Sequence, residues 1–351
     1  MYLYFIIAFV LSITLTPVLR AVFQRFHIVD APQVVARKIH KKRIPLGGGV
    51  AIFLSFFLVA WIAVMVGALG SDVSVRTIVG LFLSGLILMI GGILDDRFVF
   101  RPRQQIWFPF LAILVSLTFG LGPHEITNPF GGIWNLDQWM IPFPGIGNIV
   151  ILADALVFCW LMGMMYTTKL LDGLDGLVTG MVGIGAIMIF FLTRQGQWFQ
   201  PEVSVLALIF AGTCFGFLIW NKHPAKIFLG EGGSLFAGFI LGSLAIISGG
   251  KIAVTMFVIA IPMLDIVRVA VRRLQRNQSM FIGDREHLHY KLLGLGLSHT
   301  QTVYLFYSIA LLFGTIALFL QSAQKLLALI FLIILMLMIG IWFSKKDANE
   351  F

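Results

Sequence analysis

Apolar stretches long enough to cross a bilayer follow one another along almost the whole of this 351-residue chain. A transmembrane helix needs roughly 20 mostly apolar residues to cover about 30 Å of hydrocarbon. Hydrophobic residues make up 59% of the sequence and charged residues only 12%, which excludes an ordinary soluble domain. The pattern predicts an all-α fold, a single polytopic helical bundle over residues 1–351 with about eleven transmembrane helices. The expected spans are Tyr2–Leu19, Gly47–Gly70, Thr77–Leu94, Gln104–Leu121, Ile149–Met165, Gly176–Thr193, Glu202–Trp220, Gly232–Gly249, Ile252–Val271, Val303–Gln321 and Leu326–Phe343.

The Lys and Arg residues are distributed unevenly between alternate loops. If the N-terminus lies outside, the loops on the cytoplasmic side hold most of these residues, as the positive-inside rule requires. The basic residues left on the outer side are Arg76, Arg194, Lys251 and Lys325. We therefore expect an outer N-terminus and a cytoplasmic C-terminus. The net charge of +9 suits contact with anionic membrane lipids and anionic substrates, and no nucleic-acid partner is expected.

Carboxylates gather at the ends of several expected spans. Asp95 and Asp96 close one span, Asp172 and Asp175 precede another, and Glu231 lies beside a third. Charges at a bilayer are costly, so acids placed there indicate function. The predicted topology puts all five at the cytoplasmic rim, where they suit a divalent cation beside a phosphorylated substrate. Simple helix caps that complement the helix dipole are the alternative interpretation.

Two loops add groups that suit phosphate binding. The Gly-rich stretch Asn221–Ser234 precedes a span and offers backbone N–H groups to an anion. The stretch Asp284–Lys291 contains an HxH pattern whose Arg and His residues suit phosphate or sugar hydroxyls. We do not expect tetrahedral zinc there, because no further His or Cys is nearby in the sequence.

A secondary transporter is the rival function class, since transporters also combine many spans, broken helices and buried acids. Transporters place those acids near the bilayer midplane. In this chain only Asp154 and Asp265 are expected inside spans, which favours a site at one membrane face.

In their order along the chain, these motifs resemble the polyprenyl-phosphate N-acetylhexosamine-1-phosphate transferases, the glycosyltransferase family 4 superfamily. The resemblance runs nearly end to end. It is carried by Asp30–Pro32, Arg37–His40, Ile44–Gly49, Leu94–Arg97, Asp172–Leu177, Asn221–Ser234, Pro262–Asp265, Arg272–Arg273 and His287–His289.

The resemblance implies an enzyme that transfers a sugar phosphate from a UDP-sugar to undecaprenyl phosphate and releases UMP. It further implies that Asp95 and Asp96 handle the lipid phosphate, with Asp95 as the base, and that Asp172 and Asp175 organise the nucleotide and diphosphate. Glu231 and Asp175 would bind the metal ion, which is expected to be Mg²⁺ or, as a second choice, Mn²⁺. Implied substrate contacts are Lys38, His40, Lys169, Asn221, Lys226, Arg285, His287 and His289. The expected location is a bacterial inner membrane, and a homodimer is left open.

The chain departs from the family pattern near the acids. Tyr166 and Lys169 stand in place of two Asn residues, so we expect the Lys169 ammonium to contact the diphosphate directly. Gln105 replaces a Lys, Glu231 an Asp and Tyr290 a His.

The segment Asp284–His289 resembles the branch of the family that uses UDP-N-acetylglucosamine in O-antigen or teichoic acid synthesis. The phospho-N-acetylmuramoyl-pentapeptide transferases of peptidoglycan synthesis are the alternative branch. In either branch, an apolar groove for the prenyl chain is expected to lead from the bilayer to the acids.

Overall fold

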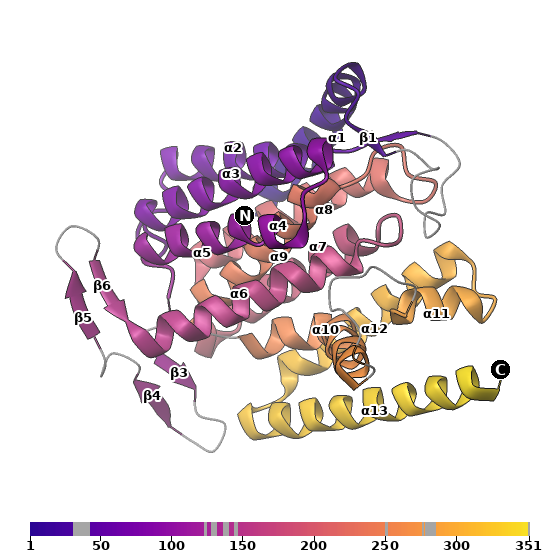
Figure 1. Cartoon of the computed structure of the whole chain (residues 1–351). Coiled ribbons are helices and arrows are strands. Elements are labelled where there is room, and N and C mark those ends of the chain that lie inside the picture. The colour runs from indigo at the N-terminus through magenta and orange to yellow at the C-terminus, as the bar shows by residue number, and fades with distance from the viewer. Residues whose placement is uncertain are drawn as a thin grey trace.

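A computed structural model of the chain describes residues 1–30, 43–122, 125–127, 132–135, 140–143, 147–249, 252–275, 277 and 286–349. Helices dominate this part of the chain (Figure 1). They are α1 (Tyr2–Arg25), α2 (Gly48–Met65), α3 (Val75–Phe98), α4 (Pro102–Gln105), α5 (Trp107–Thr118), α6 (Ile151–Leu171), α7 (Leu177–Thr193), α8 (Pro201–Asn221), α9 (Gly230–Ile247), α10 (Ile252–Gln275), α11 (Leu288–Gly294), α12 (His299–Phe319) and α13 (Ser322–Asn349), with a short 3-10 helix at Gly196–Trp198.

Eight helices in the described residues are long and apolar enough to cross a membrane, namely α1, α2, α3, α6, α8, α9, α10 and α12. The polytopic, mainly helical fold is therefore confirmed. The other expected spans fall on shorter apolar helices: α7, the stretch Ala323–Met338 of α13, and α5. Helix α5 has only 12 residues because a break at Ile106 separates it from α4.

Six short strands in the described residues depart from the all-α expectation. β1 (Val29–Asp30) pairs antiparallel with β2 (Ile44–Pro45). The remaining strands form two antiparallel hairpins in a region expected to be loop, β3 (Glu125–Thr127) with β4 (Ile133–Asn135) and β5 (Met140–Phe143) with β6 (Gly147–Val150). Chain outside a helix must still pair its backbone N–H and C=O groups. Strands of three or four residues are too short to leave an alternating pattern in the sequence.

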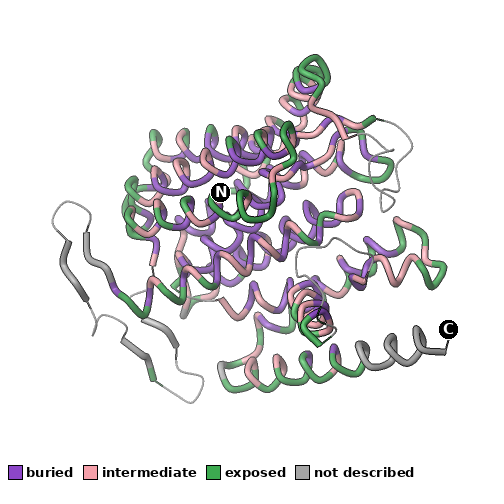
Figure 2. The backbone as a smooth tube through the Cα atoms, viewed as in Figure 1, coloured by how far each residue is buried: buried purple, intermediate pink, exposed green. Residues whose placement is uncertain are grey.

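Helix α9 forms the centre of the bundle and packs against α2, α3, α6 and α7. Within the 18-residue window of highest hydropathy, 89% of α9 is buried, against 17% of α1. In Figure 2, α1 accordingly carries much of the green that marks exposed residues. Glycines allow this packing, because a Cβ built on Gly92 of α3 would lie 2.1 Å from the Cα of Gly232. A Cβ on Gly49 of α2 would lie 2.2 Å from the Cα of Gly233. The backbones of α2 and α3 therefore touch α9 at its first turn.

The ends of the bundle differ in character. The β3–β6 hairpins lie beyond one end, on the left in Figure 1, and α11 lies beyond the other. On the hairpin side, Glu202 at the start of α8 accepts hydrogen bonds from the backbone of Gly70 to Val73 in the α2–α3 connection. At the opposite end, contacts join the last turns of α3 and α6 to the first turn of α9. The acids singled out in the sequence lie at this second end.

Candidate active site

The tandem acids Asp95 and Asp96 lie where α3 ends. The helix stops because Val99 adopts a left-handed conformation, with φ of 53°. The chain then turns back, and Asp95 Oδ1 accepts a hydrogen bond of 2.7 Å from the Phe100 N–H. Asp96 faces α9, where its Oδ1 accepts a 3.2 Å hydrogen bond from the Glu231 N–H. The end of the helix expected from the sequence is thus present, and it lets the two adjacent acids reach different partners.

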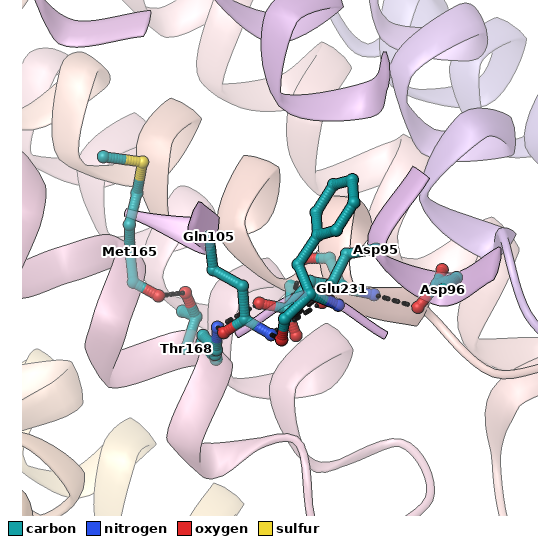
Figure 3. A network of polar contacts seen from close by, with 9 residues as sticks. Asp95, Asp96, Gln105, Met165, Thr168 and Glu231 are labelled. Carbon is teal, nitrogen blue, oxygen red and sulfur yellow. Dashed lines mark hydrogen bonds and ion pairs between the residues drawn. The ribbon is translucent and has the colours of Figure 1, made fainter. Parts of the chain in front are cut away.

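A chain of polar contacts joins Asp95 of α3 to Glu231 of α9 through residues of α4 and α6 (Figure 3). Gln105 Nε2 donates to both carboxylate oxygens of Asp95, at 3.1 and 3.0 Å. The Lys169 ammonium donates to Gln105 Oε1 at 2.9 Å and forms an ion pair with Glu231. The sequence departures at residues 105 and 169 therefore lie in direct contact with one another.

Asp172 follows α6 in a turn that is crowded by protein yet open to solvent. The surrounding protein atoms strip water from its carboxyl group, and this desolvation raises the pKa of Asp172 to about 7. Repulsion from the carboxylates of Glu231 and Asp175 raises the pKa further. The described protein groups therefore do little to stabilise the negative charge of the Asp172 carboxylate.

We predict that Asp172→Asn stabilises the metal-free protein more at pH 8 than at pH 5. An acid whose pKa is higher in the folded than in the unfolded state costs stability as the pH rises from about 4 to about 7. Solvent screening reduces the effect, so we expect the Tm advantage of the variant to grow by about 2 °C over this range. Thermal unfolding in EDTA measures it, with Asp72→Asn at the opposite end as the control. A Tm difference independent of pH would contradict the assignment.

Asp175 belongs to a cluster with two histidines from distant parts of the chain. Its Oδ2 lies 2.7 Å from His223 Nδ1 and accepts a 3.1 Å hydrogen bond from the Ala225 N–H. Its backbone N–H donates to His299 Nε2 at 3.0 Å. The two imidazole rings stack with centroids 4.1 Å apart and an interplanar angle of 20°. The cluster positions Asp175, and its three ligand atoms lie within 4.8 Å of one another, close enough to hold a metal ion.

Helices α8 and α12 hold the turn around Gly176. Asn221 Oδ1 accepts hydrogen bonds from the Gly176 N–H at 3.2 Å and the Thr179 hydroxyl at 2.9 Å, and its Nδ2 donates to the Ile227 carbonyl. The Tyr307 hydroxyl donates to the Gly176 carbonyl at 2.5 Å. Asn221 was expected to contact substrate, but its side chain is buried and its contacts here join α7, α8 and the following loop.

The two histidines expected above the sugar nucleotide have different surroundings. His287 Nδ1 lies 3.0 Å from Asp265 Oδ2, and Arg268 donates to the other oxygen of the same carboxylate at 2.7 Å. His289 is only 2% exposed, and burial, with repulsion from His287, lowers its pKa to about 3. Its Nε2 would lie 2.5 Å from a Cβ on Gly173. The absence of a side chain at Gly173 thus makes room for His289.

Two recesses open near these groups. One, of about 220 Å³, is lined by Leu171, Asp265, His287 and His289 among others. The second, of about 160 Å³, lies between α2, α3 and α9. Its apolar walls lead to Asp96. The acids stand at helix ends beside these recesses, unlike the midplane acids of a transporter.

Three expected substrate contacts, Lys38, His40 and Arg285, lie outside the described residues. Lys226 is exposed, with its ammonium 4.9 Å from the centroid of the Trp220 ring. His299 and Tyr307 were not recognised as site residues in the sequence. They are separated from the turn that they hold by 124 and 131 residues, and no local pattern marks them.

Comparison with known proteins gives a consistent result. The profile of glycosyl transferase family 4 matches residues 78–249, a range that includes Asp95, Asp96, Asp172, Asp175 and Glu231. A probable undecaprenyl-phosphate N-acetylglucosaminyl 1-phosphate transferase of Bacillus subtilis (strain 168) is 28% identical over 344 residues, covering 96% of this chain and 89% of that protein.

Two further relatives are similar. A decaprenyl-phosphate N-acetylglucosaminephosphotransferase of Mycobacterium tuberculosis (strain ATCC 25618 / H37Rv) is 28% identical over 297 residues, covering 77% of this chain and 70% of that protein. A phospho-N-acetylmuramoyl-pentapeptide-transferase of Rhodococcus opacus (strain B4) is 28% identical over 358 residues, covering 92% and 97%. Over residues 78–249 the chain is therefore similar to glycosyl transferase family 4, and the motifs and the converging acids agree with this similarity.

Proposed function

We propose that this protein transfers N-acetylglucosamine 1-phosphate from UDP-N-acetylglucosamine to undecaprenyl phosphate and releases UMP. The observation that carries the proposal is the meeting of acids from separate helices at one end of the bundle. Asp96 of α3 contacts the first turn of α9 at Glu231, and Asp172 after α6 is close enough to Glu231 for the two charges to repel. Such a cluster suits a polyanionic substrate that arrives with a divalent cation. The polyprenyl phosphate and the sugar are proposed from the activities of the two N-acetylglucosamine-phosphate transferases that the chain resembles.

The proposed setting is a bacterial inner membrane crossed about eleven times, with the N-terminus outside and the acids at the cytoplasmic face. The distribution of Lys and Arg in the sequence supports this orientation. UDP-sugars are made in the cytoplasm, so a cytoplasmic site would meet its donor directly.

The acids fit Mg²⁺ in their chemistry. Carboxylate oxygens are its preferred protein ligands, and the repulsion that raises the pKa of Asp172 marks a place where positive charge is stabilised. We assign Glu231 and Asp172 as the groups that would hold Mg²⁺, or Mn²⁺ in its place. Asp175 is a weaker candidate than the sequence indicated, because His223 and Ala225 already engage one of its oxygens. When bound, the cation would neutralise the diphosphate.

The remaining side chains position the two substrates. In the proposed reaction an oxygen of the lipid phosphate attacks the β-phosphorus of the donor, a new P–O bond forms, and UMP leaves with the electron pair of the broken P–O bond. Asp95 and Asp96 would hold the lipid phosphate, with Asp95 accepting its proton if the phosphate enters protonated. The recess that leads to Asp96 would admit the end of the prenyl chain. The Lys169 ammonium would contact the diphosphate.

The phospho-N-acetylmuramoyl-pentapeptide reaction is the alternative, and the similarity that supports it is weaker. Purified protein given undecaprenyl phosphate, Mg²⁺ and each UDP-sugar separately distinguishes the two. We expect UMP release with UDP-N-acetylglucosamine to be faster on the order of 100-fold, since polar groups of a sugar site left unpaired by the wrong substrate are costly. UMP release with the muramoyl-pentapeptide donor alone would refute the assignment.

A further inference from the structure

Lys169 puts a positive charge inside the acid cluster. Its side chain is only 17% exposed and its partner Glu231 only 19%, so the ion pair is largely withdrawn from water. The ammonium also lies 5.6 Å from the centroid of the Tyr166 ring, within reach of a cation–π interaction. These contacts keep the Lys169 ammonium beside the Glu231 carboxylate, which is the proposed Mg²⁺ ligand.

An ammonium group and a divalent cation compete for the same oxygen. Mg²⁺ binds carboxylate oxygens at about 2.0–2.1 Å, and two cations that share one carboxylate repel strongly where water is scarce. We propose, on the basis of the function proposed above, that Lys169 is the resident counter-ion of Glu231 and that a divalent cation binds by displacing it. The displaced ammonium then becomes the group that contacts the diphosphate.

Gln105 extends the consequence of this displacement to Asp95. The Lys169 ammonium donates to Gln105 Oε1, and this bond holds the amide so that its Nε2 faces both oxygens of Asp95. When Lys169 moves to the diphosphate, its bond to Gln105 Oε1 is lost, and the amide keeps only its bond of 3.1 Å to the Phe100 carbonyl besides those to Asp95. Asp95 can then turn to the lipid phosphate. Binding of Mg²⁺ and the UDP-sugar at Glu231 would thereby free the Asp95 carboxylate to act as the base. The contacts through Lys169 and Gln105 connect the two events.

Mg²⁺ binding to the full-length protein without substrates tests the proposal. The measurement is the rise in Tm with Mg²⁺ concentration in detergent, for wild type, Lys169→Gln, Lys169→Arg and, as a matched loss of one charge, the exposed Lys222→Gln. We expect Lys169→Gln to bind Mg²⁺ about tenfold more tightly, the size typical of coupling between two binding events. Lys169→Arg, which keeps the charge, should bind no more tightly than wild type, and Lys222→Gln should match wild type.

The possible outcomes distinguish the displacement of Lys169 by Mg²⁺ from the proposed transferase function. Equal or weaker Mg²⁺ binding by Lys169→Gln overturns the displacement and leaves the transferase assignment standing. Equal tightening by Lys169→Gln and Lys222→Gln also overturns it, because the effect would then be one of net charge. If none of the proteins binds Mg²⁺ and UMP is still released, both the displacement and the metal-assisted reaction are refuted. Tighter binding by Lys169→Gln alone supports the proposal.

Discussion

We expect Asp95→Asn to reduce UMP release by about 10³-fold, a loss typical of removing a general base, while the protein remains folded. Asp95 accepts three hydrogen bonds, from Phe100 and from the Gln105 amide. The substituted amide has one acceptor in place of two, so its own NH₂ group must face another donor. The change therefore removes the basic oxygen and also displaces Gln105. UMP release at saturating substrates measures the effect.

The control for this prediction is Asp72→Asn, the same substitution at an exposed acid of the opposite end. We expect it to leave UMP release unchanged. Asp96→Asn should also lower the rate strongly, because Asp96 is the acid that both contacts Glu231 and lines the apolar recess. An Asp95→Asn variant that keeps more than a tenth of the wild-type rate would exclude Asp95 as the base.

Gly92→Ala is expected to give the largest structural effect of a single methyl group. The added Cβ would lie 2.1 Å from both the Cα and the N of Gly232, which are backbone atoms that cannot rotate away. Overpacking of this kind costs about 1–3 kcal/mol. Helices α3 and α9 must then separate, and with them Asp96 and Glu231. Since a misplacement of about 1 Å in an active site can cost 10²-fold in rate, we expect a lower Tm and about 100-fold slower UMP release.

Gly294→Ala is the matched control, because no atom lies within 4 Å of the position where its Cβ would be. We expect its Tm to equal or slightly exceed that of wild type, since alanine restricts the unfolded chain more than glycine does. Normal activity of Gly92→Ala would show that the contact between α3 and α9 does not determine the spacing of the acids.

The sequence was most informative about features that repeat along a single helix. Each expected span overlaps a helix, and Asp95 and Asp96, which were expected to close one span, lie in the last turn of α3. Such features depend on local hydropathy, local volume and the helical period, which neighbouring residues encode.

Contacts between distant segments were not predicted. Gln105 and Lys169 are 64 residues apart, and each departure from the family pattern looked isolated until the fold placed them in contact. The same holds for His299, whose contact with Asp175 spans 124 residues. Helical periodicity gives the apolar face of each helix, but not which faces of which helices meet. His289 shows the limit most directly, because its sequence context predicted a substrate contact but did not indicate that its side chain is buried beside Gly173.

Transfer of label from UDP-N-acetylglucosamine with a radioactive β-phosphate tests the central claim most directly. The protein in detergent, given undecaprenyl phosphate, is assayed with Mg²⁺ and with EDTA, as wild type and as Glu231→Gln. We predict that the wild type with Mg²⁺ moves the label into the lipid and releases unlabelled UMP. EDTA should abolish this transfer, and Glu231→Gln should greatly reduce it. Label that stays with the nucleotide, or that reaches the lipid equally well in EDTA and in Glu231→Gln, would contradict the account.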